Sequence, residues 1–349
     1  MRENGVLNRG SHEAATRRVV LVTALALAGV AVVLLTVPQA LGAQRVLGIA
    51  QLISFRAPLA IGLGTLALLV CLIATVRRRR RPVFARGLAL ILAVGAIANG
   101  AVLVTRGSAG EALPHGDLVV MAWNAQGGAT SPVEVAQVAG ASRADVVSLP
   151  ETDEDAAAEV ARLLAQQGIS MTPHTVRAEG EYDWIPTSVL IADDLGDYEF
   201  DASAGTTPGL PSGVWKKTAG TGPASIVAVH PLPPLPDTMG GWVAGLKWVA
   251  GICISSGSDV VVAGDVNATV DHMAGLGTDG HLIGRCDDAA LETRSASSGT
   301  WPSDAPSWIG SPIDHVLFGS SWTAKGVRVV DGDPGGTDHG AIVVVLDRR

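Results

Sequence analysis

The stretch Asp259-Val-Val-Val-Ala-Gly-Asp-Val-Asn-Ala-Thr269 decides how the chain is organised. Its valines follow one another without a polar interruption, which predicts a strand buried on both faces that ends at Gly264. Asp265 and Asn267 then lie at the carboxyl end of the strand, where a carboxylate and an amide can hold a water beside a developing oxyanion. By itself Gly-Asp-x-Asn is more often a turn, so the interpretation depends on similar stretches elsewhere.

Charge and hydropathy divide the chain into two parts. The first 106 residues carry 13 Arg and no Lys against two Glu, a net charge of +11. The remaining residues carry 12 basic against 31 acidic side chains, or −19, so that the 349 residues together have a net charge of −8. With a mean hydropathy of +0.34, this asymmetry predicts a membrane domain, residues 19–106, joined to an acidic domain, residues 107–349.

Three uncharged apolar runs are each long enough to cross a hydrocarbon core of about 30 Å. They cover residues 19–37, 58–76 and 87–104. The run Arg77 to Arg81 separates the last two, whereas the loop after the first carries only Arg45 and Arg56. The positive-inside rule therefore predicts that the arginine run and the tail of residues 1–18 are cytoplasmic and that the acidic domain is extracytoplasmic.

The first apolar run has a second interpretation, as a signal peptide cleaved at Ala40-Leu-Gly-Ala43. The two spans that remain would still return the acidic domain to the outside. We therefore expect a multi-pass protein of the plasma membrane, with the lipid bilayer as its partner.

Cys253 and Cys286 are the only cysteines of the exported part, because Cys71 falls in the second apolar run. An oxidising compartment makes an even pair a disulfide candidate. Two separately buried thiols are the alternative. A bridge would tie the helix predicted before the Asp259–Thr269 stretch to the segment after it.

The acidic domain begins with two units of strand and helix. Strands are predicted at residues 118–124 and 145–151. Ser131-Pro-Val-Glu134 is a capping-box helix start, and the helix from Thr152 to Gln167 closes at Gly168.

Short runs with turn signals follow, which is typical of antiparallel strands. These strands are predicted at residues 187–192, 198–202, 214–218, 224–230, 313–318, 327–330 and 339–346. Asp237 is expected to cap an apolar helix that reaches Ile254. Because strands this apolar need cover on both faces, the sequence predicts a mixed α/β (α+β) domain with helices outside two sheets.

Polar side chains recur at the predicted strand ends, and they are the types that hydrolysis of a phosphate ester requires. They are Asn124, Glu151, His230, Asp265, Asn267, Asp314, Asp338 and His339. A hard divalent cation binds carboxylate oxygen, and the phosphoryl charge needs hydrogen-bond donors. A water needs a base, and a carboxylate beside a histidine tunes the ring for that chemistry.

In their order along the chain, these motifs resemble those of the endonuclease/exonuclease/phosphatase superfamily, the metal-dependent phosphoesterases related to DNase I. The resemblance covers residues 118–346 and implies a four-layer α-β-β-α sandwich with the site at the sheet edges. The motifs are Trp123-Asn124, Leu149-Pro-Glu151, Val227-Ala-Val-His230, Gly264-Asp-Val-Asn267, Ile313-Asp-His315 and Thr337-Asp-His339.

Three departures from the superfamily pattern stand out. Gln126 replaces an Asp of the abasic-site endonuclease branch. Thr337 and Gly340-Ala341 replace a Ser before and a Pro after the closing Asp-His motif of many members. They argue against a close kinship with the DNA-repair branch.

The resemblance implies a metal site. Glu151 would hold a Mg²⁺ or Mn²⁺ ion, with Asn124 and Asp338 completing or supporting the shell.

The resemblance also implies catalytic roles. Asp265 ranks first and His339 second as the group that activates the attacking water. Asn267 and His230 would donate to the oxygens on phosphorus, and Asp314 would orient His339.

The remaining histidines and several tryptophans have no role that the sequence identifies. His115, His174, His272, His281 and His315 are expected to be surface or packing residues. Core packing or the rim of a lipid-side pocket is expected for Trp215, Trp242, Trp248, Trp301 and Trp308.

The charge of −19 argues against a long nucleic-acid substrate, because such binders use clustered Lys and Arg to displace counterions. The layout resembles membrane-anchored superfamily members linked to glycopeptide resistance in actinobacteria. Our hypothesis is a metal-dependent phosphoesterase that acts on a lipid-linked or envelope phosphate. An extracellular nuclease and a non-catalytic envelope-binding module are the alternatives, and the sequence does not separate monoesters, diesters and pyrophosphates.

Overall fold

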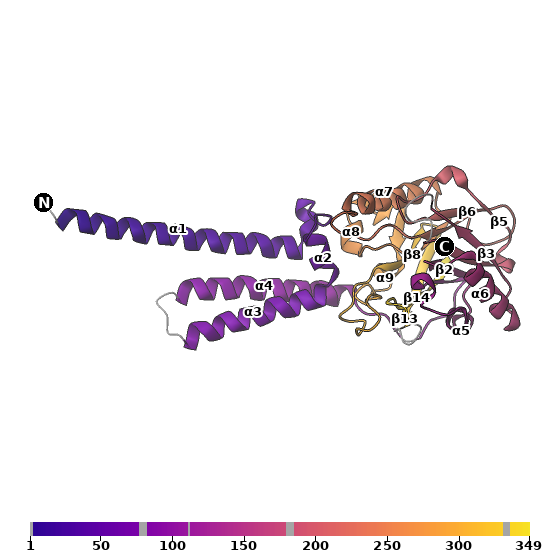
Figure 1. The fold of residues 1–349 in the computed structure, drawn as a ribbon, viewed down its shortest axis with the longest axis horizontal. Helices are drawn as coiled ribbons and strands as arrows, with labels where there is room; N and C mark the ends of the chain where they lie inside the picture. Colours follow the sequence, from indigo (N-terminus) through magenta and orange to yellow (C-terminus); the bar gives the residue numbers. More distant parts are fainter. Residues whose placement is uncertain (1–2, 77–81, 111, 179–184, 331–335) are drawn as a thin grey trace.

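The protein consists of a helical rod and a β-rich domain, and the computed structural model describes residues 3–76, 82–110, 112–178, 185–330 and 336–349. Three long helices project together from one end of the domain (Figure 1). They are α1 (Glu3–Thr36), α3 (Arg56–Val76) and α4 (Pro82–Arg106), and the short helices η1 (Pro38–Leu41) and α2 (Ile49–Ser54) connect α1 to α3. The arginine run of residues 77–81 lies outside the described residues.

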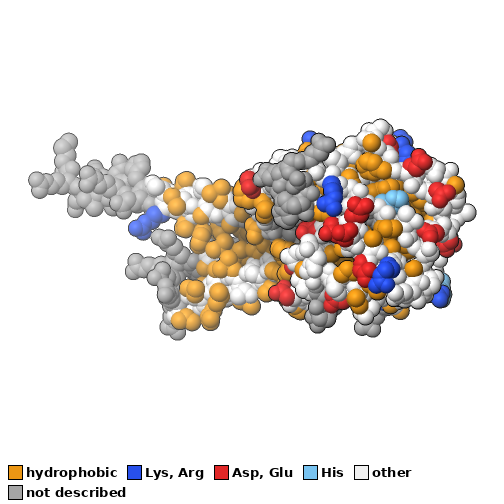
Figure 2. All heavy atoms as spheres, turned by 45° about the vertical axis from the view of Figure 1, so that its right-hand side comes forward, with side chains coloured by type: hydrophobic (Ala, Val, Ile, Leu, Met, Phe, Trp, Pro, Cys, Tyr) orange, Lys and Arg blue, Asp and Glu red, His pale blue; other side chains and the backbone are white. Residues whose placement is uncertain are grey.

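The three long helices are apolar enough to cross a membrane. The suitable parts are Ala15–Thr36, Arg56–Val76 and Val83–Arg106, with mean hydropathies of 2.8, 2.5 and 2.3. Hydrophobic side chains cover their described surface, whereas charged side chains gather on the domain (Figure 2). The three predicted spans are therefore present as helices, and their apolar surface suits lipid rather than water.

Two mixed sheets form the centre of the domain. The six-stranded sheet has the order β13 (Trp322–Val330), β14 (Ala341–Arg348), β1 (Leu118–Ala122), β2 (Val146–Pro150), β4 (Thr187–Ala192) and β3 (Met171–Val176). The eight-stranded sheet has the order β5 (Tyr198–Phe200), β6 (Gly213–Lys217), β7 (Ser225–Val229), β8 (Val260–Asp265), β12 (Asp314–Gly319), β11 (Cys286–Asp288), β10 (Ile283–Gly284) and β9 (Leu276–Gly277).

Alternating residues of each central strand fill a different layer of the core. Val120 of β1 packs between the sheets with Val261 and Val344, whereas its neighbour Met121 packs on the outer face of the six-stranded sheet. Because successive side chains of a strand point to opposite faces, both faces of such a strand are buried. This explains why the strands are apolar throughout.

Helices cover the outer faces of both sheets. On the six-stranded sheet lie α5 (Pro132–Ser142) and α6 (Glu154–Gln166), and on the eight-stranded sheet lies α7 (Met239–Ser255) (Figure 1). The shorter helices are η2 (Gln126–Gly128), η3 (Asp193–Leu195), η4 (Ala202–Ala204), α8 (Val270–Met273) and α9 (Ala289–Glu292). The predicted four-layer α-β-β-α sandwich is confirmed.

Several elements differ from the sequence expectation, among them the short strands β9, β10 and β11 and the helices α8 and α9, which were not predicted. Strand β3 was not predicted, because Pro173 and polar neighbours interrupt its apolar pattern. The proline is tolerated in this strand because β3 lies at the edge of the sheet. Helix α7 begins after Thr238 rather than at Asp237, and no side chain caps it. Strand β13 begins at Trp322, not at Val327, and its first part contains a bulge between Ala324 and Gly326.

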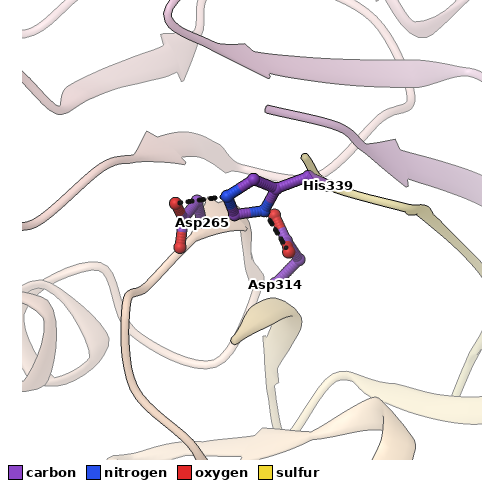
Figure 3. A group of neighbouring side chains, drawn as sticks. All are labelled: Asp265, Asp314 and His339. Atoms are coloured by element: carbon purple, nitrogen blue, oxygen red, sulfur yellow. Dashed lines mark hydrogen bonds and ion pairs between the residues drawn. The ribbon is translucent and has the colours of Figure 1, made fainter. Parts of the chain in front are cut away.

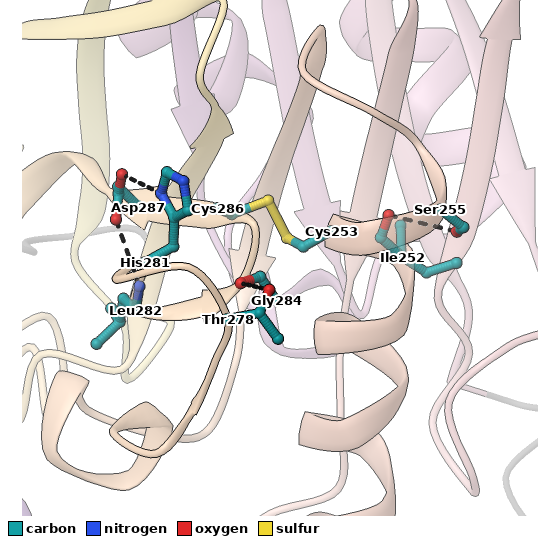
Figure 4. Close-up of a disulfide and its surroundings, with 9 residues drawn as sticks. All are labelled: Ile252, Cys253, Ser255, Thr278, His281, Leu282, Gly284, Cys286 and Asp287. Atoms are coloured by element: carbon teal, nitrogen blue, oxygen red, sulfur yellow. Dashed lines mark hydrogen bonds and ion pairs between the residues drawn. A yellow bond between two sulfur atoms is a disulfide. The ribbon is translucent and has the colours of Figure 1, made fainter.

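Cys253 of α7 and Cys286 of β11 form a disulfide (Figure 4). Both cysteines are buried, and they lie 33 positions apart in the sequence. In the loop beside the bridge, His281 Nδ1 lies 2.7 Å from Asp287 Oδ2. The disulfide joins α7 to strand β11 of the eight-stranded sheet, which α7 covers.

A buried ionic cluster joins the helical rod to the domain. Asp271 of α8 accepts two hydrogen bonds from Arg56 at the start of α3 and two from Arg106 at the end of α4. It also accepts one from Gln39, and the side chains of Arg56 and Asp271 are only 4% and 1% exposed. Burial raises the pKa of Asp271, but the two arginines outweigh this effect and hold it well below its ordinary value.

The loop between α1 and α3 adds further contacts to α8. Arg45 donates to the backbone carbonyls of His272 and Ala274, and His272 Nε2 lies 3.0 Å from the carbonyl oxygen of Ala50. Arg45 of this loop and Arg56 at the start of α3 are thus both bound to the domain. Because α8 begins three residues after Asn267, the rod is attached beside the predicted site.

Candidate active site

The six-stranded sheet brings three of the predicted side chains to one edge. Asn124 and Glu151 follow the parallel strands β1 and β2. His339 precedes β14, which runs antiparallel to β1, so that its start lies beside the end of β1. Thr337 Oγ1 donates to the carbonyl of Asn124 and accepts from the backbone N–H of His339. The hydroxyl at this position therefore ties the closing motif to the end of β1.

The eight-stranded sheet contributes three more side chains. His230 follows β7 and Asp265 ends β8, and these two strands are parallel neighbours. Asp314 begins β12 directly opposite Asp265 in the antiparallel register. The oxygen Thr300 Oγ1 accepts from the backbone N–H of Asp314 and so holds the start of β12. The strand ends of both sheets thus converge on one place.

The backbone at the site adopts conformations that most residues avoid. Gly264 has φ of 149°, and a Cβ atom there would lie 2.1 Å from the carbonyl oxygen of Val229 in the next strand. Glu151, Asn267 and Gln126 have φ of 58°, 50° and 48°. Left-handed conformations of residues other than glycine cost about 1–3 kcal/mol and cluster at functional sites.

His339 lies between two carboxylates (Figure 3). Its Nδ1 is 2.9 Å from Asp314 Oδ2, and its Nε2 is 3.7 Å from Asp265 Oδ2. Burial lowers the pKa of His339, but Asp314 and Asp265 outweigh it and raise the pKa to about 10. Both carboxylates therefore favour the protonated form of the ring, in which Nε2 is a donor toward Asp265.

Asp265 is the side chain that Asn124, His230 and His339 all approach. Burial raises its pKa, and the nearby positive charge of His339 opposes this effect. Its Oδ1 accepts from the backbone N–H of Asn267 at 2.8 Å, and its Oδ2 accepts from Asn124 Nδ2 at 3.1 Å. The nitrogen of Asn124 also donates to Glu151 Oε1 at 3.0 Å, while its oxygen accepts from the backbone N–H of Gln126. In this orientation Asn124 links the two carboxylates.

His230 completes the floor of the site. Its Nε2 lies 3.6 Å from Glu151 Oε1 and 3.8 Å from Asp265 Oδ2. Burial lowers its pKa to about 3, so that the ring is neutral. Its Nδ1 is buried and has no hydrogen-bond partner among the described residues.

Two predicted residues lie at the margin. Asn267 uses its side-chain nitrogen to donate to the carbonyl of Pro231 at 3.0 Å. Asp338 is 43% exposed, and its Oδ1 is 3.9 Å from His339 Nε2. Its other oxygen accepts from Trp301 Nε1 at 2.8 Å. Both residues line the same cavity as Asp265.

The donors present fit a divalent cation. Asp265, Asp314 and His339 each offer a ligand atom, and these atoms lie within 4.8 Å of one another. Glu151 adds a carboxylate that is 25% exposed. In the described part of the chain, the ion-pair partners of these carboxylates are histidines, with no Lys or Arg among them. Such an excess of carboxylate oxygens is the donor set that Mg²⁺ or Mn²⁺ takes.

A cavity of about 510 Å³ opens onto the site. Its polar floor includes Glu151, Asp265 and His339, and its sides include Leu232, Leu235 and Trp301. Among the residues that the structure describes, no Lys or Arg lines it. The site is thus reached through a largely apolar opening.

Some residues near the site were not identified from the sequence. His315 Nδ1 lies 2.7 Å from Asp288 Oδ2, and its Nε2 lies 2.8 Å from the carbonyl oxygen of Ala268, behind the Asp265 loop. Its place in the Ile313-Asp-His315 motif was the available signal. Of the five tryptophans named from the sequence, Trp215 and Trp242 are core residues, and Trp301 borders the cavity.

Solved structures share this fold at low sequence identity. A humanized TDP2 from D. rerio is 17% identical with a TM-score of 0.50, and the match covers 66% of this chain and 98% of that one. An endonuclease/exonuclease/phosphatase family protein from Bacteroides thetaiotaomicron is 16% identical with a TM-score of 0.50, over 66% and 97% of the two chains. A mannosyl-6-phosphatase from the same species is 16% identical with a TM-score of 0.48, over 66% and 99%.

The sequence itself carries the family assignment. No curated protein sequence matches the chain at a significant level. The profile of the Endonuclease/Exonuclease/phosphatase family matches residues 121–339, which is more than half of the chain and includes every predicted catalytic and metal-binding residue. The chain therefore belongs to the Endonuclease/Exonuclease/phosphatase family, whose members hydrolyse phosphate esters.

Proposed function

We propose that the protein is a membrane-anchored, extracytoplasmic phosphoesterase that depends on a divalent metal and hydrolyses a lipid-linked or envelope phosphate. The observation that carries the proposal is the convergence of Asn124, His230 and His339 on Asp265 at the floor of the cavity. The family supports the reaction class, and the three apolar helices support the membrane location.

Glu151 is the residue that would hold the metal, with Asn124 beside it and Asp338 at the margin. Its carboxylate is 25% exposed and lines the cavity, whereas Asp314 is buried and does not line it. A Mg²⁺ or Mn²⁺ ion there would supply positive charge opposite the phosphate oxygens. We assign Asp314 the role of orienting His339 rather than of binding the metal, because the two side chains are hydrogen-bonded to each other.

The other side chains would serve the water and the phosphate. Asp265 has one oxygen fixed by the N–H of Asn267, and the other faces the site, where it would accept a proton from the attacking water. His339, held by Asp314 through Nδ1, would donate from Nε2 to an oxygen on phosphorus. His230 and Asn267 would donate to the same group.

The cavity lining supports a small or lipid-linked phosphate over a nucleic-acid polymer. A polymer substrate needs cations along its backbone. The described lining of the cavity contains none and is instead apolar beyond the catalytic floor. A binding module without catalysis has no need of a buried His339–Asp314 pair beside Asp265.

The experiment is hydrolysis by the full-length protein in detergent of a panel of phosphate monoesters, diesters and diphosphates, with and without EDTA. Glu151→Gln, Asp265→Asn and His339→Ala should each lower kcat by about 10²- to 10⁴-fold. Combined changes should cost far less than the product of the single losses, because these residues act as a unit.

His281→Ala is the matched control, since His281 also pairs with an aspartate but lies in the loop beside the disulfide (Figure 4). It should leave kcat nearly unchanged. If any of the three site variants, shown to be folded, keeps activity within about threefold of the wild type, the site is misassigned.

A further inference from the structure

One wall of the active-site cavity comes from the membrane part of the chain. The lining residues from this part are Gln51, Ser54 and Phe55. Gln51 and Ser54 belong to α2, and Phe55 follows it, immediately before Arg56 begins the apolar helix α3. A site built by the sandwich alone would have no need of them, so the cavity is complete only when the rod and the domain are joined.

Direct contacts hold this wall against the domain. The rings of Phe55 and Trp301 are 5.7 Å apart between centroids, at an interplanar angle of 51°. Gln51 Nε2 donates to the carbonyl oxygen of Pro234 in the loop before α7. Arg56, the residue after Phe55, is bound to Asp271. The position of the wall is therefore fixed relative to the catalytic floor.

The wall and the floor differ in chemistry. Asp265, Glu151 and His339 offer oxygens and N–H donors that suit a divalent metal and a phosphate. Phe55, Leu235 and Trp301 offer carbon surface, and Leu235 is half exposed although it is large and apolar. An exposed apolar surface beside a polar site marks a place for an apolar ligand group.

The position of the wall indicates where that apolar group comes from. Phe55 precedes the first residue of a helix that is apolar enough to cross a membrane. With α3 in a bilayer, the wall would lie at the level where the hydrocarbon begins. A phosphate on the catalytic floor would then have its hydrocarbon chain directed along Phe55 toward the membrane.

We infer that Phe55, together with Leu235 and Trp301, forms a subsite for the hydrocarbon chain of an amphiphilic phosphate ester. The membrane part thus acts as a specificity element as well as an anchor. This inference rests on the proposed phosphoesterase function and adds the residues that select its substrate.

The test compares butyl and decyl substrates with the full-length protein in one detergent. Each pair is supplied as the monophosphate, the diphosphate and the 4-nitrophenyl diester, and the ratio of kcat/KM for decyl over butyl is measured. We expect a ratio of at least about tenfold in the wild type, because even one methylene in an apolar pocket changes kcat/KM by roughly tenfold or more.

Phe55→Ala should bring the ratio down to within about threefold of unity, while hydrolysis of the butyl substrate continues. Phe55→Leu should keep an intermediate ratio. Phe200→Ala is the matched control, because Phe200 packs on Trp215 at the same 5.7 Å between centroids but lies in the edge strand β5. This control should keep the wild-type ratio of kcat/KM for decyl over butyl. Because the same detergent is used, partition of the substrate into detergent affects all variants equally.

The inference is overturned if the wild type shows no preference for decyl, or if Phe55→Ala keeps the preference. Should Phe55→Ala also lose butyl hydrolysis through damage to the fold, Leu235→Ala decides, since that half-exposed side chain is not part of the core. A lowered ratio in Leu235→Ala supports the subsite, and an unchanged ratio rejects it. Failure of the proposed function is a separate outcome, in which the wild type hydrolyses neither chain length.

Discussion

Gly264 occupies a position that no other residue can fill. Its φ of 149° is disfavoured for residues with a Cβ, and an added Cβ would lie 2.1 Å from the carbonyl oxygen of Val229. Gly264→Ala should force β7 and β8 apart and lower the free energy of unfolding by more than about 3 kcal/mol. Thermal unfolding of the full-length protein measures this.

A second glycine, Gly257, distinguishes the cost of the positive φ from the cost of the contact with Val229. It also has a positive φ, 76°, but no heavy atom lies within 4 Å of the Cβ that alanine would add. Gly257→Ala should cost only about 1 kcal/mol, the conformational part alone. Equal losses for the two variants would show that the contact with Val229 is irrelevant.

Asp145 is a half-buried carboxyl outside the site. Burial raises its pKa to about 6, and the charge of Asp194 adds to this, although the backbone N–H of Val119 donates to it. Below about pH 4 the carboxyl is protonated in both the folded and the unfolded state, and above about pH 6 it is charged in both. The contribution of Asp145 to the free energy of unfolding should therefore fall as pH rises from 4 to 6.

Asp145→Asn removes this charge and keeps an acceptor for Val119. At pH 7.5 it should raise the free energy of unfolding by about 1–2 kcal/mol, since solvent partly screens the half-buried charge. At pH 4 the gain should vanish. Chemical denaturation at both pH values measures the difference, with the exposed Glu199→Gln as control. A gain of the same size at both pH values would contradict the assignment.

At this scale the sequence predicts which residues reach the site but not how they pair. Asn124, Glu151 and Asp265 were identifiable because each polar group ends an apolar strand, and strand ends meet at a sheet edge. The pairing of His315 with Asp288 depends on how β11 and β12 align, across 27 residues of chain. No local pattern encodes that alignment.

At the scale of elements, α8 is the connection between the rod and the site. Its Asp271 is the counterion of Arg56 and Arg106, and it lies six residues after Asp265. Asp271→Asn should lower the free energy of unfolding by about 3–5 kcal/mol, because Arg56 would remain buried without a counterion. Thermal unfolding of the full-length protein in detergent is the measurement.

Lys216→Ala is the control for this change. Lys216 pairs with Asp201 at 2.6 Å, but its side chain is exposed to solvent. Removing an exposed pair should change the free energy of unfolding by less than about 1 kcal/mol. If Asp271→Asn costs no more than Lys216→Ala, the cluster does not hold the rod to the domain.

Elements with a strong pattern were predictable, and elements defined by tertiary contacts were not. The helix start at Ser131 follows from local chemistry, since its hydroxyl accepts from the N–H of Glu134 as a capping box requires. Strand β3 has no such pattern and exists because β4 offers it a partner. The loop arginines were interpretable only as topology signals, because nothing near Arg56 in sequence indicates Asp271.

At the scale of the whole molecule, the structure places three helix ends on the domain side of the rod. The end of α1, the start of α3 and the end of α4 all lie next to the domain (Figure 1). With three spans, the N-terminal tail and the domain must then lie on opposite sides of a membrane. Which side holds the domain remains our proposal, and the bound arginines strengthen it. Arg45 and Arg56 are bound by domain contacts, so their charge is already paired on the domain side of the rod.

The orientation can be tested by labelling intact cells with a membrane-impermeant maleimide. In a Cys71→Ser background, Cys253 and Cys286 do not react because they form a disulfide. A cysteine introduced at Glu199 in the domain should be labelled in intact cells, with the outer envelope opened if there is one. A cysteine introduced at Ala15 should be labelled only after the plasma membrane is permeabilised, because the positive-inside rule keeps the arginine-rich tail in the cytoplasm. The reverse pattern would place the domain in the cytoplasm and, with it, remove the lipid-linked envelope phosphate as the substrate.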